Sequence, residues 1–206
     1  MTNWGLVATI KAPVSDILDF AAYHLEAGAH RLYIYLDDDN PDAFAALKPH
    51  PKLRVIQCNK AHWQKLGGRP AKHQVRQTRN ATHAYARRAE VDWLIHMDVD
   101  EFLWTDHPVA DLLSALAADQ LCARTRPIEA IAGDGNLFKG FIPPGPDRQA
   151  IVQRIYPNFG AHVKGGFLSH LAGKLFVRTG LGALTVKIHN VFLDDQMNPG
   201  EIELPE

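Results

Sequence analysis

Residues 93–103 read WLIHMDVDEFL, an apolar run that passes directly into an acidic one. The apolar part, Trp93 to Met97, is typical of a strand buried on both faces of a parallel sheet. If the chain stays extended beyond it, side chains two positions apart point the same way, so Asp98 and Asp100 share a side. Two carboxylates at a strand end suit Mg²⁺ or Mn²⁺, although strands also end in Asp where it only forms a turn or caps a helix. We therefore expect a buried strand with a metal site at its end.

Apolar runs of this kind alternate with helical patterns through the first 118 residues. The expected strands cover residues 6–10, 32–36, 53–58 and 93–97, and the expected helices cover about residues 15–28, 41–47, 74–89 and 108–116. This order predicts a mostly parallel, Rossmann-like sheet flanked by helices, because parallel neighbours need crossover connections. Ligands of such sheets bind beyond the carboxyl ends of the strands. After residue 120 glycine and proline are frequent, which predicts a β-rich, loop-heavy second half.

Charge is unevenly distributed along a chain whose formal net charge is only −1, which argues against a nucleic-acid binder. Asp37 to Asp39 end the second apolar run, so they are expected at the same sheet edge as Asp98. Residues 43–89 contain no Asp or Glu but 11 of the 22 Lys and Arg residues. This separation favours an anionic substrate, although a solvated basic helix face would look the same. The predicted phosphate contacts, beside a Gly-Gly loop and a helix start, are Arg69, Lys72 and Arg76.

The remaining composition indicates the compartment. Cys58 and Cys122 are the only two cysteines, each inside an apolar run, which excludes a disulfide scaffold and fits a reducing compartment. The first residues leave no room for a signal peptide, and no apolar run approaches the ~20 residues that span a bilayer. We expect a cytoplasmic protein without a transmembrane segment, with peripheral membrane association left open.

Three stretches resemble glycosyltransferases of family 2 with a GT-A fold, in the branch related to family 92. Residues 17–35 hold the helix, the Tyr-His pair, the glycine and the second strand of that family. Residues 93–103 are similar to its Asp-x-Asp-Glu-Phe segment, and residues 173–190 to its Lys…Arg strand with a later His. The resemblance implies a GT-A-type α/β fold.

The same resemblance implies one glycosyltransferase domain over residues 1–206. Within it, residues 1–118 would bind the nucleotide sugar, residues 119–193 would face the acceptor, and residues 194–206 would form a mobile acidic tail. It implies a metal-dependent transfer from a nucleotide diphosphate sugar, with a UDP-sugar favoured, to a hydroxyl of a sugar or glycan acceptor, with inversion. Polysaccharide biosynthesis is the usual context of such enzymes.

The resemblance also assigns residues to roles. The metal ligands, for Mn²⁺ or Mg²⁺, would be Asp98, Asp100 and His189, with Asp98 also facing the diphosphate. The base and ribose pocket would be lined by Ile10, Lys11 and Asp37. Trp104 is a candidate for stacking on a sugar ring, with a core position as the alternative.

An inverting transfer needs a carboxylate to take the proton of the acceptor hydroxyl. The candidates are Asp134 in a Gly-Asp-Gly turn, Glu101 and Glu129. Two other functions stay open: a catalytically inactive or truncated nucleotide-sugar-binding module, and a metal-dependent phosphoryl or nucleotidyl transferase, which also uses paired carboxylates. No Walker-type phosphate loop is present to support the latter.

Overall fold

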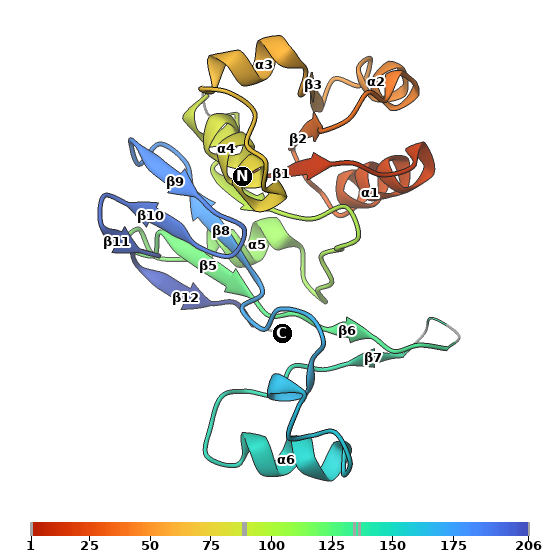
Figure 1. Cartoon of the computed structure of the whole chain (residues 1–206). Coiled ribbons are helices and arrows are strands. Elements are labelled where there is room, and N and C mark those ends of the chain that lie inside the picture. The colour runs from red at the N-terminus through yellow and green to blue at the C-terminus, as the bar shows by residue number, and fades with distance from the viewer. Residues whose placement is uncertain (1, 88–89, 134, 136, 206) are drawn as a thin grey trace. The chain divides into compact units, whose positions relative to one another are not determined.

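The predicted alternation of strands and helices is present in the computed structural model (Figure 1), which describes residues 2–87, 90–133, 135 and 137–205. The chain divides into two units, one made of residues 1–124 and 174–206 and a smaller one of residues 125–173. The expected acceptor half, residues 119–193, is thus shared between the two units.

A seven-stranded sheet forms the centre of the larger unit, in the order β12-β5-β8-β4-β1-β2-β3. Its strands are β1 (Trp4–Ile10), β2 (Arg31–Leu36), β3 (Leu53–Gln57), β4 (Trp93–His96), β5 (Cys122–Thr125), β8 (Lys174–Arg178) and β12 (Glu201–Glu203). The pairs β4-β1, β1-β2, β2-β3 and β12-β5 are parallel, and β8 runs antiparallel to β4. The mostly parallel sheet predicted from the sequence is therefore confirmed.

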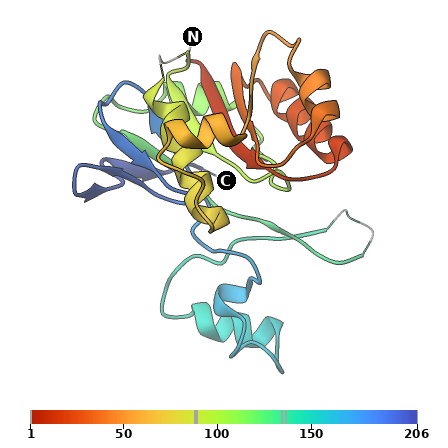
Figure 2. The same cartoon turned by 45° about the horizontal axis from the view of Figure 1, so that its top comes forward.

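Helices cover both faces of this sheet (Figure 2), because alternate side chains of each strand point to opposite faces. The helices are α1 (Val14–Glu26), α2 (Pro41–Leu47), α3 (Lys60–Lys65), α4 (His73–Ala86) and α5 (Val109–Ser114). Leu6 and Ile95 belong to a core that includes Phe20 of α1. Val7 and Leu94, one position along each strand, belong to a second core that includes Ala81 of α4.

Side chains cap the first turn of two helices. Asn40 caps α2 by accepting a hydrogen bond from the Ala43 amide at 3.1 Å. Helix α3 was not predicted, although Asn59 caps it in the same way through the His62 amide. Helix α1 follows Pro13 directly and has no side-chain cap.

Residues 194–206, expected as a mobile tail, contain β11 (Gln196–Met197) and the edge strand β12. Strand β11 completes a three-stranded sheet with β9 (Leu184–Val186) and β10 (Val191–Leu193). Cys58 and Cys122 are both buried, as their apolar surroundings predicted. Among the helices that the described residues form, none has the length and apolar character needed to cross a bilayer.

The smaller unit consists of a two-stranded hairpin and one helix. Its elements are β6 (Glu129–Ala130), β7 (Phe138–Lys139), α6 (Arg148–Ile155) and a short 3-10 turn, η1 (Lys164–Gly166). Gly173, at its end, has a φ of +67°, and a side-chain carbon there would overlap the carbonyl oxygen of Thr125. Glycine is therefore required where the chain returns to the large sheet.

Candidate functional site

The chain leaves β4 in a tight turn over residues 98–101, here called the acidic turn. The Glu101 amide donates to the Asp98 carbonyl at 3.1 Å, and the Asp98 amide donates to Glu101 Oε2 at 2.9 Å. These two bonds close the turn, so the expectation of an extended segment was wrong. We expected Asp98 and Asp100 to share a side. The turn instead brings Asp98 close to Glu101, three positions further along the chain.

Two neighbouring elements hold the Asp98 carboxylate. Lys174, on the antiparallel strand β8, places its Nζ 2.7 Å from Asp98 Oδ2 and 2.8 Å from Glu101 Oε2. Gln77 of α4 donates its side-chain amide to the other oxygen, Asp98 Oδ1. The Lys174 side chain is only 7% exposed. Sequence reasoning placed Lys174 only in the strand that resembles the Lys…Arg strand of the family. Its contact with Asp98 was missed, because no local pattern indicates a contact between residues 76 positions apart.

The charges around the turn set the protonation of its members. Burial acts to raise the pKa of Asp98, but Lys174 and the hydrogen bonds to this carboxylate together hold that pKa below its usual value. For Glu101 burial prevails, and its pKa is raised. Burial lowers the pKa of His96, on the same strand, to about 3, and neither ring nitrogen has a hydrogen-bond partner among the described residues. At neutral pH Asp98 is therefore a carboxylate beside a neutral imidazole.

The three predicted metal ligands are not gathered into one cage. Asp100 is exposed and makes no hydrogen bond or ion pair with any residue that the structure describes. His189 is half-buried, and no group of three His, Cys, Asp or Glu side chains in the described ranges is placed to hold a metal.

The turn nevertheless suits a hard divalent cation. One or two carboxylates suffice for Mg²⁺ or Mn²⁺ where substrate phosphates and water complete the coordination. The ammonium group of Lys174 already occupies a cation position between Asp98 and Glu101. The donor chemistry of the acidic turn therefore fits the predicted metal.

The second acidic strand end is neutralised by arginine. Asp37 follows β2, and its side chain is 1% exposed. Arg69 donates to Asp37 Oδ1 at 3.0 Å, and Arg76 donates to Oδ2 at 2.7 Å. Arg69 and Arg76, which were predicted to contact phosphate, and Asp37, which was predicted to contact the ribose, thus form a single ion cluster. The cluster lies at the same sheet edge as the acidic turn, because β2, β1 and β4 are parallel neighbours.

The other predicted donor contacts surround this cluster. Lys72 directly precedes α4, and no side chain caps the first turn of that helix. Ile10, the last residue of β1, is buried, whereas Lys11 after it is exposed. Of these residues, Lys11 and Lys72 present their side chains to solvent.

Helix α1 holds the segment that follows the acidic turn. The Tyr23 hydroxyl donates to the Leu103 carbonyl at 2.7 Å. The His24 ring is parallel to that of Phe102, with ring centroids 5.9 Å apart. Trp104 is 74% exposed, which excludes the core position considered for it.

The candidate bases differ in their surroundings. Glu129, in the smaller unit, accepts from the Ser169 amide at 2.8 Å and pairs with Lys139 at 2.6 Å. Burial acts to raise its pKa, but these donors lower it overall, so this carboxylate is a weaker base than a free one. Asp134 lies outside the described residues. Glu101 is the candidate that belongs to the acidic turn.

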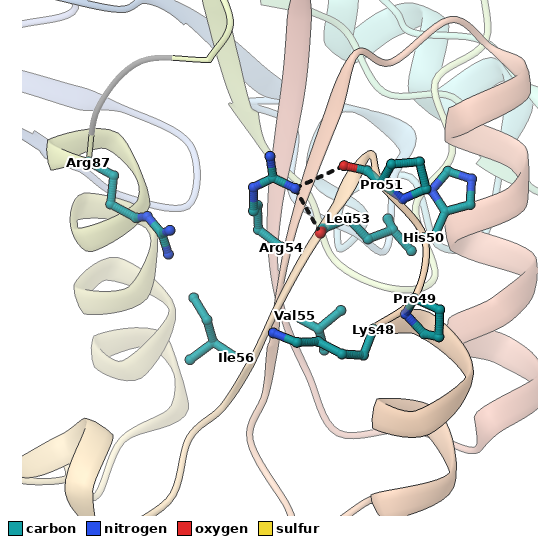
Figure 3. A pocket seen from close by; sticks show the side chains of 9 residues that line it. All are labelled: Lys48, Pro49, His50, Pro51, Leu53, Arg54, Val55, Ile56 and Arg87. Carbon is teal, nitrogen blue, oxygen red and sulfur yellow. Dashed lines mark hydrogen bonds between the residues drawn. The ribbon is translucent and has the colours of Figure 1, made fainter.

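A surface pocket of about 320 Å³ lies at the edge strand β3 (Figure 3). It is lined by residues 48–51 and 53–56 and by Arg87. The Arg54 guanidinium group in this pocket donates hydrogen bonds to the Pro51 and Leu53 carbonyls. The pocket contains no acidic residue and none of the predicted site residues, so it is separate from the candidate site.

Comparison with known proteins and families indicates the family of this chain. No curated protein matches the chain. The solved structures that resemble it include a 4-diphosphocytidyl-2C-methyl-D-erythritol synthase, at 10% identity over 87% of this chain and 76% of that one, with a TM-score of 0.42. HddC from Yersinia pseudotuberculosis resembles it at 11% identity over 86% and 77%, also with a TM-score of 0.42. Scores this low assign no function.

The sequence model of glycosyltransferase family 92 matches residues 7–121. This range is more than half of the chain, and it contains helix α1, the Asp37 cluster and the whole acidic turn. Because the family model matches more than half of the chain, the chain belongs to glycosyltransferase family 92 and is a glycosyltransferase.

Proposed function

We propose that this enzyme transfers the sugar of a nucleotide diphosphate sugar, with UDP as the favoured nucleotide, to a hydroxyl of a sugar or glycan acceptor. The transfer depends on Mn²⁺ or Mg²⁺ and inverts the anomeric carbon. The observation that carries this proposal is the placement, at one sheet edge, of a cation-holding acidic turn and the two arginines on Asp37. A diphosphate needs both kinds of partner.

Asp98 and Asp100 would hold the metal together with the diphosphate oxygens. When bound, the metal acts as a Lewis acid that neutralises the charge of the departing diphosphate. Before the metal binds, the chain keeps Asp98 ionised and fixed, through Lys174 on one oxygen and Gln77 on the other. Asp100, exposed and unengaged by described residues, supplies the second carboxylate.

The arginines would receive the phosphates from the other side. Asp37 fixes Arg69 and Arg76 through one oxygen each, so both guanidinium groups are oriented before a ligand arrives. Arg69 remains 48% exposed, which leaves N–H donors for a phosphate. The uncapped first turn of α4 favours an anion at the same place. Lys11 remains our candidate for the base and ribose, whereas Asp37, buried and bonded to both arginines, would act on the donor through them.

In the inverting step the acceptor oxygen attacks the anomeric carbon, its proton passes to a carboxylate, and the nucleoside diphosphate leaves. Glu101 and Asp134 are the candidate bases, and Glu101 is the one within the described residues. Trp104, exposed three positions after Glu101, offers an aromatic face for the acceptor sugar.

The test is a screen of nucleotide sugars for release of the nucleoside diphosphate, with MnCl₂ and with EDTA. We expect turnover of a UDP-sugar that EDTA abolishes, and UDP should raise the melting temperature only when metal is present. Asp100→Ala should remove that stabilisation. Stabilisation by UDP that is independent of metal would contradict the proposal, and binding without turnover of any donor would indicate a binding module.

A further inference from the structure

The cation that the acidic turn holds is a side chain of the protein itself. Lys174 Nζ lies 2.7 Å from Asp98 Oδ2 and 2.8 Å from Glu101 Oε2, and the side chain reaches this place from β8 almost completely buried. The opposite oxygen of Asp98 is taken by Gln77. Both oxygens of the principal metal ligand are therefore engaged before any metal binds.

A divalent cation cannot join this arrangement unchanged. It would meet the Lys174 ammonium at the same carboxylate, where two positive charges repel strongly in a half-buried setting. Gln77 is neutral, so displacing it would relieve no repulsion. Lys174 has a flexible four-carbon stem and a second carboxylate, Glu101, already within 2.8 Å. The group that can give way is Lys174.

We propose that Lys174 is an internal counter-ion that occupies Asp98 until metal and nucleotide enter together, and then moves to Glu101 and the diphosphate. This inference rests on the proposed metal-dependent function. Its consequence is that the free enzyme binds metal weakly, because the metal must first displace the ammonium. The diphosphate supplies the negative charge that accommodates both cations, so metal and nucleotide bind cooperatively. Lys174 is a positioning residue in this scheme.

A merely structural lysine predicts a different behaviour. If Lys174 only stabilised the turn, its removal would lower the melting temperature and leave metal affinity unchanged or weaker. If it competes with the metal, its removal leaves Asp98 and Glu101 facing each other without a cation. Metal alone would then bind more tightly than it binds to the wild type.

The experiment is titration of the full chain with Mn²⁺, with free Mn²⁺ followed by electron paramagnetic resonance, in the absence and presence of UDP. Without UDP we expect Lys174→Gln to lower the Kd for Mn²⁺ by about tenfold or more. With UDP the two proteins should differ much less, so the cooperativity between Mn²⁺ and UDP shrinks by a similar factor. Arg31→Gln, which removes a largely buried cation from the ion pair with Glu90, is the matched control and should bind Mn²⁺ like the wild type.

Equal Kd values for wild type and Lys174→Gln without UDP would overturn the inference and leave the proposed function intact. Failure of every protein to bind Mn²⁺, with or without UDP, would refute the metal dependence itself. Should Lys174→Gln not fold, the wild type carries the test through the cooperativity between Mn²⁺ and UDP. UDP should lower the Kd of the wild type for Mn²⁺ by about tenfold or more, because the diphosphate accommodates both cations. Equal Kd values for Mn²⁺ with and without UDP would overturn the inference.

Discussion

His24 makes the free energy of unfolding sensitive to acid, and one substitution, His24→Phe, can measure this contribution. It lies on α1, fully buried, and its Nδ1 donates to the Phe20 carbonyl at 2.8 Å. Its other ring nitrogen has no partner among the described residues. Burial is the main cause that lowers the pKa of His24 from 6.5 to about 4. The folded chain therefore keeps this imidazole neutral under conditions where the unfolded chain protonates it.

The direction of the effect follows from proton counting. Between pH 6.5 and pH 4 the unfolded state binds a proton at His24 that the folded state does not, so stability falls as the pH falls through this window. One pKa unit corresponds to about 1.4 kcal/mol, so this residue removes roughly 3 kcal/mol by pH 4. His24→Phe keeps a ring against Phe20 and Phe102 and abolishes the titration. Loss of the hydrogen bond should cost it about 1 kcal/mol at pH 7.

The assay is urea denaturation of both proteins at pH 7, 6, 5 and 4.5. We expect the wild type to be more stable at pH 7, and the two stability curves to cross at roughly pH 6. Other buried histidines, such as His96, are shared by both proteins and cancel in the difference. Parallel loss of stability in the two proteins from pH 7 to pH 4.5 would refute the reasoning.

Three further substitutions test other parts of the structure. Gly173→Ala should destabilise the fold by more than about 2 kcal/mol, measured by urea denaturation, because φ is +67° and the new carbon would overlap Thr125. Arg69→Ala should raise the Kd of UDP by about tenfold in calorimetry with little change in melting temperature, since Arg76 still neutralises Asp37; unchanged affinity would remove Arg69 from the donor site. Trp104→Ala should raise the acceptor KM while leaving donor hydrolysis intact, because this exposed ring supports no core.

The fold was largely predictable because its central strands are apolar on both faces. In Leu32–Leu36 and Trp93–Met97 nearly every residue is apolar, which in an alternating α/β pattern indicates a parallel sheet. The placement of Asp37 and Asp98 was predictable for the same reason, since parallel strands bring both residues to one edge of the sheet. What these residues contact there was less accessible to sequence reasoning.

One missed feature depends on a contact between distant segments, and another on the geometry of a local turn. Lys174 reaches Asp98 only because β8 inserts antiparallel beside β4, after the chain has left the sheet to form the smaller unit. The pairing of Asp98 with Glu101 depends on the hydrogen bonds of a turn, which an alternation rule cannot represent. The smaller unit has no comparable periodicity, because β6 and β7 have only two residues each.

Two family segments that lie far apart in the sequence meet at the acidic turn. Tyr23 donates a hydrogen bond to the backbone of Leu103, and the ring of His24 packs on that of Phe102, just after the turn. Gln77 and Lys174 fix its first carboxylate from α4 and β8. Because α1 and α4 belong to different cores, the turn is held from both faces of the sheet. In the scheme proposed above only Lys174 moves when metal and nucleotide bind, so Gln77 and the backbone of the turn would need little reorganisation when charge develops on a departing diphosphate, which is the condition for effective electrostatic catalysis. The Tyr-His pair of α1 is therefore part of the architecture that holds the acidic turn, although neither side chain belongs to the turn itself.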